Sequence, residues 1–340
     1  MLSIKINKTL LDNPFINASG CYCKDSSELD LLINSNASSI ITKTCTPDIR
    51  KGNPEPRYHH NNELSINSMG IPNNGLKYYL SYFSKYGLND NENNNNNTTI
   101  LKDNKLKLIS LGGLSLNDNL EMLKDCLLYY YSDLSNFNGI EVNFSCPNLI
   151  GHPQLGYDFD NLEHYLMKLL ELLNKFEDEN HKNEKLLFGI KLPPYFDMSH
   201  FKTVANIINR YPRINFITCI NSIGNGIVIN TNKEEVVIKP KDGFGGIGGS
   251  VIKSTALANV HKFYKLLGDS VFIIGCGGIV NGEDAFQHIL CGASMVSIGT
   301  QLIKDGPNVF NKIEKELVNI MKMKGYKTIN DFKGKLKYIE

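Results

Sequence analysis

Short apolar runs typical of buried strands alternate with longer amphipathic segments along this 340-residue chain. Several of the runs are continuously apolar, as strands covered on both faces should be. The predicted strands are Ser39–Lys43, Ser65–Ser68, Lys107–Leu111, Ile140–Ser145, Leu187–Leu192, Phe216–Asn221, Val271–Gly275 and Met295–Gly299. The predicted helices are Ser26–Leu32, Gly75–Tyr86, Leu116–Tyr130, Asn161–Asn174, Ser199–Asn209, Thr255–Leu267 and Gly282–Leu290. This alternation predicts an α/β fold, a (β/α)8 TIM barrel, with a doubly wound sheet as the alternative.

Two segments fall outside this alternation. Asn89–Thr99 contains Asn93 to Asn97 in a row, a low-complexity polar composition that predicts a disordered surface loop. Strand and helix patterns resume unchanged on both sides of this insert, so we expect residues 1–340 to form a single barrel domain. Glu235–Lys239 alternates polar and apolar side chains, which predicts a small strand or hairpin added to the barrel.

The charge balance limits the kinds of partner. Lys+Arg 36 against Asp+Glu 35 leaves a net charge of +1, so no global basic field exists to bind a nucleic acid. No signal-peptide or presequence pattern is present, and every apolar run is far shorter than the ~20 residues of a membrane-spanning helix. We therefore expect a cytosolic protein without a membrane or nucleic-acid partner. The histidines and the cysteines show no metal-ligand spacing, so no metal site is expected.

Polar residues follow the predicted strands at their carboxyl ends. They occur in the segments Thr42–Thr44, Asn67–Gly70, Asn143–Asn148, Lys191–Pro194, Asn221–Ser222, Gly275–Gly278 and Gly299–Thr300. In a barrel these strand ends meet at one mouth, which is where barrel enzymes carry out their chemistry. The sequence therefore predicts an active site at this mouth.

Three glycine-rich segments favour a bound phosphate. Two of them follow consecutive predicted strands, at Gly275–Gly278 and at Gly299, and Gly245–Ser250 is predicted as a third loop that opens a helix. Backbone N–H groups freed by glycine in the last loops of a barrel form its usual phosphate site. Lys43 and Lys191 end strands that are otherwise buried, and together they favour an anionic cofactor or substrate.

Uncharged amides and one cysteine complete the predicted mouth. Asparagine side chains both donate and accept hydrogen bonds, so a set of them is suited to the edge of a planar heterocycle. Cys146 precedes Pro147, which predicts an extended or turn conformation, and Cys146–Tyr157 is predicted to be a mobile loop over the mouth. A thiol on such a loop can act as a base or as a nucleophile.

These residues together resemble the dihydroorotate dehydrogenases, and specifically the soluble class 1A enzymes. The matching motifs run nearly end to end: Asn17–Gly20, Ile41–Thr44, Gly52–Tyr58, Ser65–Asn73, Asn143–Asn148, Pro153–Phe159, Gly189–Asp197, Asn221–Gly226, Lys239–Gly249 and Asp284–Phe286. The resemblance implies an FMN-binding barrel that oxidises (S)-dihydroorotate to orotate in pyrimidine (UMP) biosynthesis. Hydride would go to flavin N5 and a proton to Cys146, which the resemblance identifies as the base, with Lys43 and Lys191 assisting.

The resemblance also assigns two sets of binding residues. Those expected to hold FMN are Ala18, Ser19, Lys43, Thr44, Asn143, Lys191, Ile220, Gly249, Cys276, Gly277, Gly278, Gly299 and Thr300. Those expected to surround dihydroorotate or orotate are Lys43, Asn67, Met69, Gly70, Ile71, Asn143, Asn148, Asn221 and Ser222. Thr44, Ile71 and Cys276 stand where serine, leucine and threonine are common in the family.

The subclass determines the expected electron acceptor. Membrane-bound class 2 enzymes have serine at the base position and an N-terminal helical extension, and class 1B enzymes work with an iron–sulfur partner and NAD. The segments Gly52–Tyr58 and Pro153–Phe159 follow the class 1A pattern, which implies a homodimer that reduces fumarate without an iron–sulfur subunit. The alternatives are NAD or quinone as acceptor, another FMN barrel such as a tRNA-dihydrouridine synthase, and a non-catalytic scaffold barrel.

Overall fold

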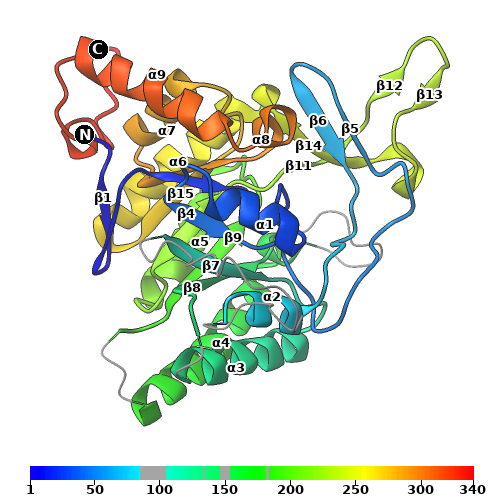
Figure 1. The fold of residues 1–340 in the computed structure, drawn as a ribbon, viewed down its shortest axis with the longest axis vertical. Coiled ribbons are helices and arrows are strands. Elements are labelled where there is room, and N and C mark those ends of the chain that lie inside the picture. The colour runs from blue at the N-terminus through cyan, green and yellow to red at the C-terminus, as the bar shows by residue number, and fades with distance from the viewer. Residues whose placement is uncertain (85–104, 133–134, 146–153, 181–183) are drawn as a thin grey trace, which may run out of the picture.

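A closed barrel of eight parallel strands forms the centre of the molecule (Figure 1). The computed structural model describes residues 1–84, 105–132, 135–145, 154–180 and 184–340. The barrel strands in chain order are β3 (Phe15–Asn17), β4 (Ser39–Ile41), β7 (Leu106–Leu111), β8 (Gly139–Asn143), β9 (Leu187–Leu192), β10 (Phe216–Cys219), β15 (Phe272–Cys276) and β16 (Met295–Ile298). The ring closes by pairing β16 with β3. The predicted (β/α)8 barrel is confirmed.

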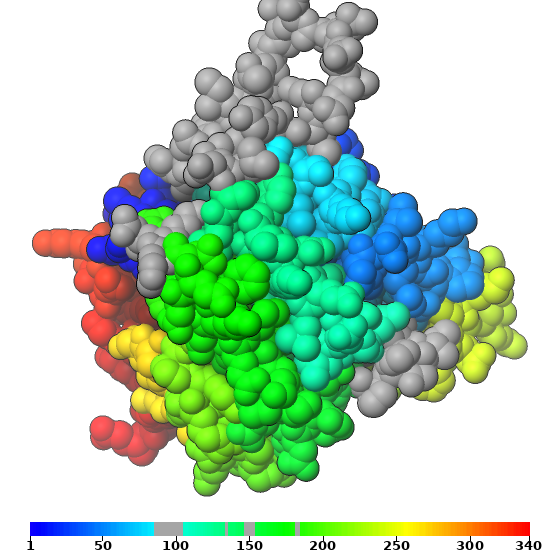
Figure 2. Space-filling view, turned by 90° about the horizontal axis from the view of Figure 1, so that it is seen from below, coloured from blue at the N-terminus to red at the C-terminus, as the bar shows by residue number. Residues whose placement is uncertain are grey.

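Helices cover the outside of the barrel and several begin at side-chain caps. They are α1 (Ser26–Ile33), α2 (Leu76–Tyr82), α3 (Leu116–Tyr131), α4 (Phe159–Asn180), α5 (Met198–Arg210), α6 (Lys253–Leu267), α7 (Gly282–Leu290), α8 (Thr300–Asp305) and α9 (Val309–Met323). Ser115 caps α3, and a capping box of Asn281 and Asp284 begins α7. Helices α3 and α4 pack side by side on the surface seen in Figure 2. The predicted helices are present, whereas α8 and α9 have no predicted counterpart.

A four-stranded antiparallel sheet stands beside the barrel. It comprises β5 (Tyr58–His60), β6 (Leu64–Asn67), β11 (Ile223–Gly226) and β14 (Gly245–Gly249), in the order β11-β14-β6-β5. The prediction that Ser65–Ser68 belongs to the barrel ring is wrong, because this segment pairs with β14 in the added sheet. The eighth place in the ring belongs to β3, whose three residues form too short an apolar run to be recognised.

The glycines of Gly245–Gly249 form a strand and not the predicted loop that opens a helix. Only a short 3-10 turn, Ser250–Ile252, separates β14 from α6. A Cβ atom on Gly246 would lie 2.2 Å from Ser222 Oγ, and one on Gly245 would lie 2.6 Å from the carbonyl oxygen of Asn67. Glycine is required here by close packing between β14 and its neighbours.

Two hairpins complete the described structure. Strands β12 (Ile229–Asn230) and β13 (Glu235–Val236) form the hairpin expected around Glu235–Lys239, and Figures 1 and 2 place it beside β5 and β6 at one side of the molecule. Strands β1 (Ile4–Ile6) and β2 (Thr9–Leu11) form the other hairpin, whose Ile6 and Leu11 pack with Ile16, Leu108, Phe216 and other buried side chains. An apolar cluster therefore fills the amino-terminal end of the barrel, which leaves the carboxyl end for a site.

Some expectations fall on residues that the structure does not describe. The insert Asn89–Thr99 lies outside the described residues, and so does 146–153, the first part of the predicted loop Cys146–Tyr157. The end of that loop is a 3-10 turn at Leu155–Tyr157. Among the helices that are described, none is both long and apolar enough to cross a membrane.

Candidate active site

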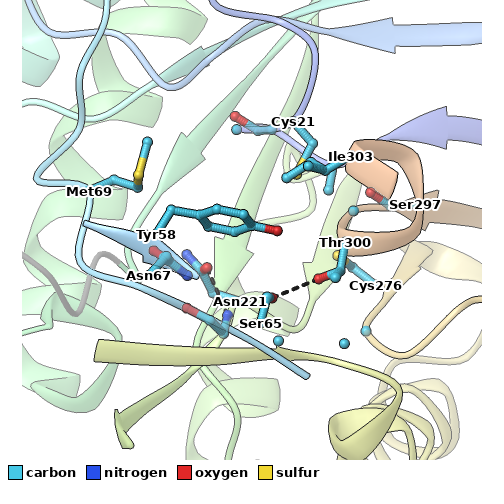
Figure 3. A pocket seen from close by; sticks show the side chains of 18 of the residues that line it. Cys21, Tyr58, Ser65, Asn67, Met69, Asn221, Cys276, Ser297, Thr300 and Ile303 are labelled. Carbon is cyan, nitrogen blue, oxygen red and sulfur yellow. Dashed lines mark hydrogen bonds between the residues drawn. The ribbon is translucent and has the colours of Figure 1, made fainter. Parts of the chain in front are cut away.

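A cavity of about 490 Å³ lies at the carboxyl ends of the barrel strands, between the barrel and the added sheet (Figure 3). It has the size of a typical small-molecule site. Every predicted site residue that the structure describes lines it: Ala18, Ser19, Lys43, Thr44, Asn67, Met69, Gly70, Ile71, Asn143, Lys191, Ile220, Asn221, Ser222, Gly249, Cys276, Gly277, Gly278, Gly299 and Thr300. Cys146 and Asn148 lie outside the described residues.

Two buried lysines give one side of the cavity a positive charge. Lys43 is 8% exposed and its Nζ donates to the carbonyl oxygen of Gly20 at 3.3 Å, while Lys191 on β9 is 4% exposed. Burial lowers the pKa of Lys191, but electrostatic interactions with neighbouring acidic groups, Glu141 among them, outweigh burial, so its pKa lies above the ordinary value. Two enclosed ammonium groups are suited to an anionic ligand.

A chain of amide and hydroxyl groups connects residues in or just after β3, β4, β7, β8 and β10. Thr44 Oγ1 lies 3.1 Å from Ser19 Oγ and 2.9 Å from Ser110 Oγ. Asn143 Nδ2 donates to Thr44 Oγ1 at 3.2 Å, and Asn221 Nδ2 lies 3.4 Å from Asn143 Oδ1. These groups are held in place by one another, so the cavity presents preorganised uncharged donors and acceptors.

The wall opposite the barrel comes from the added sheet and the segment after β6. Asn67 Nδ2 donates to the carbonyl oxygen of Gly246 at 3.1 Å, which fixes the amide at the end of β6. Gly70 has a φ of +67°, and a Cβ atom there would lie 2.3 Å from Asn53 Oδ1. Arg50 Nε donates to the carbonyl oxygen of Gly70 at 2.8 Å. The segment Met69–Ile71 is therefore held against the cavity by the contacts of Gly70 with Arg50 and Asn53.

Glycines form the end of the cavity at β15 and β16. Gly277 and Gly278 have φ values of +128° and +75°. His288 Nε2 donates to the carbonyl oxygen of Gly277 at 3.0 Å, and Lys253 Nζ forms a 2.7 Å ion pair with Asp284 next to this turn. The turn is thus anchored from behind, and its cavity side carries no side chain at Gly277 or Gly278. Such a glycine turn allows close approach of a phosphate to backbone N–H groups.

Three lining side chains that received no role from the sequence also face the cavity. Figure 3 shows the ring of Tyr58 reaching into it from β5, with Ser65 and Cys21 nearby. Burial raises the pKa of Tyr58 to about 12 and that of Cys21 to about 11, so both are neutral near pH 7. Tyr58 and Ser65 belong to the matching motifs, but only the added sheet, unrecognised in the sequence, turns them toward the barrel mouth.

Comparisons with known proteins identify the family. A sequence profile described as "Dihydroorotate dehydrogenase" matches residues 1–321. The chain is 47% identical over 339 residues to "Dihydroorotate dehydrogenase (fumarate)" of Saccharomyces cerevisiae, which covers 99% of each chain. The chain belongs to the dihydroorotate dehydrogenase family. A "Putative dihydroorotate dehydrogenase A (fumarate)" of Streptococcus agalactiae is 48% identical over 329 residues, or 96% of each chain.

A solved structure supports the fold. A dihydroorotate dehydrogenase from Eimeria tenella, in complex with ferulenol, superposes with a TM-score of 0.78 at 22% identity and covers 98% of this chain and 88% of its own. The near full-length curated relatives place this dihydroorotate dehydrogenase in the fumarate type, class 1A, and make it an oxidoreductase. They do not favour a tRNA-dihydrouridine synthase or a scaffold barrel.

Dihydroorotate dehydrogenases imply a flavin cofactor, and the cavity fits one. A flavin nucleotide combines a planar heterocycle with a phosphate group. The cavity offers hydrogen-bonding amides and hydroxyls at Asn143, Thr44 and Ser19, and a side-chain-free glycine turn at Gly277–Gly278. Lys191, which lines the same cavity, adds a positive charge. This donor set matches both parts of the flavin.

Proposed function

We propose that this dihydroorotate dehydrogenase binds FMN in the 490 Å³ cavity and there oxidises (S)-dihydroorotate to orotate, with fumarate as the final acceptor. The observation that carries the proposal is that all the described residues expected to bind cofactor or substrate line this one cavity. They come from strand ends far apart in the sequence, so the fold brings together the same residues that the sequence motifs assign to one site. We propose that residues 1–340 form a single domain that contains this site.

The cofactor would be held by residues at the carboxyl ends of strands from both the first and the last parts of the chain. Bound FMN supplies two-electron chemistry, accepting a hydride from a substrate carbon and returning reducing equivalents to fumarate, which becomes succinate. Gly277, Gly278, Gly299 and Thr300 would bind its phosphate, with Gly249 and Cys276 beside them. The remaining residues would contact the flavin ring and its sugar chain: Ala18, Ser19, Lys43, Thr44, Asn143, Lys191 and Ile220.

The substrate would form hydrogen bonds with amide groups and an ion pair with a lysine. Dihydroorotate carries a carboxylate and a ring with alternating N–H and C=O groups. Lys43 would pair with its negative charge, and Asn67, Asn143 and Asn221 would donate to and accept from the ring edge. Met69, Gly70, Ile71 and Ser222 would close the pocket around it, and Asn148 is assigned to the same set by resemblance alone.

Cys146 would act as the base. Oxidation breaks the C5–H bond as a proton leaves and the C6–H bond as a hydride leaves, and a C5=C6 double bond forms. The thiolate of Cys146 would take the C5 proton. The residue just before it, Ser145, is fully buried, and its carbonyl oxygen accepts a hydrogen bond from Asn221 Nδ2. The residue immediately before Cys146 is therefore bonded to a side chain that lines the cavity, which supports this role.

The assembly and location also remain proposals. Exposed apolar side chains in the hairpin and next to the added sheet, Ile227, Ile229 and Phe244, support a homodimer formed through this side of the molecule. We further propose a cytosolic enzyme that needs no iron–sulfur subunit.

Absorbance spectroscopy of the purified protein tests the proposal. We expect a bound flavin that is released as FMN on denaturation, and a shift of the flavin spectrum on addition of orotate. Protein that neither carries nor takes up FMN would contradict the cofactor assignment. A flavin spectrum that does not respond to saturating orotate would contradict the substrate assignment while leaving the cofactor assignment intact.

A further inference from the structure

A buried carboxyl group lies beneath the floor of the cavity and has no part in the chemistry described so far. Glu141 is on β8, two residues before the cavity-lining Asn143, so both side chains point into the barrel. Glu141 is 2% exposed, and the apolar cluster that includes Phe216 and Ile274 fills the barrel below. A charge at this depth is costly unless something compensates it.

The neighbouring strands provide that compensation. Thr218 Oγ1 on β10 donates a 2.5 Å hydrogen bond to Glu141 Oε2, while Oε1 has no hydrogen-bond partner among the described residues. Burial raises the pKa of the Glu141 carboxyl group, and the charge of Lys191 and the hydroxyls of Thr218 and Ser110 oppose this rise. The registers Asn143↔Lys191 and Lys191↔Thr218 place Lys191 on the strand between the two members of the hydrogen bond.

Glu141 and Lys191 interact through charge and not through direct contact. Across the described part of the chain, no ion pair within 4.0 Å joins them, so the ammonium group stays available to the cavity that it lines. A carboxylate behind a lysine stabilises the charged lysine and also reduces the positive potential that the lysine projects. These two effects are coupled and both act on whatever occupies the cavity above.

We infer that Glu141 is a positioning residue for the flavin reaction: its carboxylate partly offsets the positive charge of Lys191 and so sets how strongly Lys191 favours the reduced, negatively charged flavin. This inference rests on the proposed binding of FMN. Without Glu141, Lys191 presents an uncompensated positive charge, and the reduced flavin gains stability. Without Lys191, Glu141 is an isolated buried carboxyl group and becomes neutral.

The midpoint potential of the bound flavin in Glu141→Gln holoenzyme tests the inference. We expect the equilibrium between reduced and oxidised flavin to shift about tenfold toward the reduced form, about 30 mV for a two-electron couple. In a Lys191→Met background, the same Glu141→Gln change should have less than a twofold effect, because the carboxyl group is already neutral there. A purely structural role for Glu141 would not produce this dependence on Lys191.

Variants of Thr218 provide a second measurement if Glu141→Gln fails to bind flavin. Thr218→Val removes the hydrogen bond that favours the carboxylate and should shift the equilibrium in the same direction by about twofold to threefold, whereas Thr218→Ser should match the unmodified enzyme. Unchanged or lowered potentials in Glu141→Gln and Thr218→Val, or an equal shift with and without Lys191, would overturn the inference. Failure of the unmodified protein to bind FMN would instead overturn the proposed function.

Discussion

Ser65 Oγ and Thr300 Oγ1 lie 2.8 Å apart although 235 residues separate them in the sequence (Figure 3). Ser65 belongs to β6 of the added sheet, and Thr300 begins α8 directly after barrel strand β16. Their hydrogen bond joins the added sheet to the barrel at the edge of the cavity. The cavity therefore lies between two parts of the fold, and its shape depends on the contact between Ser65 and Thr300.

Removing the Ser65 hydroxyl should weaken flavin binding. Loss of one partly buried hydrogen bond costs about 1 kcal/mol, which corresponds to about a fivefold rise in the Kd for FMN in Ser65→Ala. Titration of the apoprotein with FMN, followed by flavin fluorescence, measures this change. Ser270→Ala serves as the control, because among the described residues its hydroxyl bonds only to the carbonyl oxygen of Leu267, and Ser270 does not line the cavity. Equal Kd values for both variants would show that the hydrogen bond between Ser65 and Thr300 does not contribute to FMN binding.

The glycine turn after β15 should not tolerate a side chain. Gly278 has a φ of +75°, and an added Cβ would lie 2.6 Å from Lys253 Cα. We expect Gly278→Ala to raise the Kd for FMN more than about tenfold, because left-handed strain and displacement of the turn add together. Gly325 has the same φ of +75° with nothing within 4 Å of the added atom, so Gly325→Ala isolates the strain. Its FMN binding should be unchanged.

The sequence was sufficient for the fold class and for much of the site, because both depend on local signals. Long apolar runs such as Leu187–Leu192 identify barrel strands, and polar residues at their ends identify the mouth. It was insufficient where structure depends on distant pairing. Strand β3 has only three residues, and Ser65 and Tyr58 reach the cavity only because β6 pairs with a glycine strand about 180 residues later. In the sequence Glu141 is one polar residue in a predicted strand, and only the pairing of β8, β9 and β10 brings it near Lys191 and Thr218.

Acid should destabilise the enzyme through His288. Burial lowers the pKa of this histidine from 6.5 to about 4 in the folded state. Between these values the unfolded chain binds a proton that the folded chain does not, so stability is full above pH 6.5 and falls as the pH drops toward 4. The loss should reach about 3 kcal/mol near pH 4. Urea unfolding of the unmodified protein and of His288→Gln at several pH values isolates this contribution, which should be absent from the variant.

Cys146 should control the pH dependence of substrate oxidation. The thiolate is the active form and a free thiol has a pKa of about 8.5, so flavin reduction by dihydroorotate should accelerate as the pH rises toward that value. Cys146→Ala should retain FMN and lose at least about 100-fold in the reduction rate near neutral pH. Cys146→Ser should recover part of the rate only at more alkaline pH. Anaerobic stopped-flow absorbance measures these rates, and near-normal reduction in Cys146→Ala would show that another group is the base.

The central claim is that one cavity oxidises dihydroorotate and passes the reducing equivalents to fumarate. The most direct measurement is an anaerobic double-mixing experiment, in which dihydroorotate first bleaches the flavin absorbance and fumarate, NAD or a soluble quinone is then added in parallel. We predict full bleaching, followed by rapid reoxidation with fumarate and formation of succinate, with little reoxidation by NAD. Absence of bleaching, or reoxidation by NAD or quinone but not by fumarate, would contradict the account.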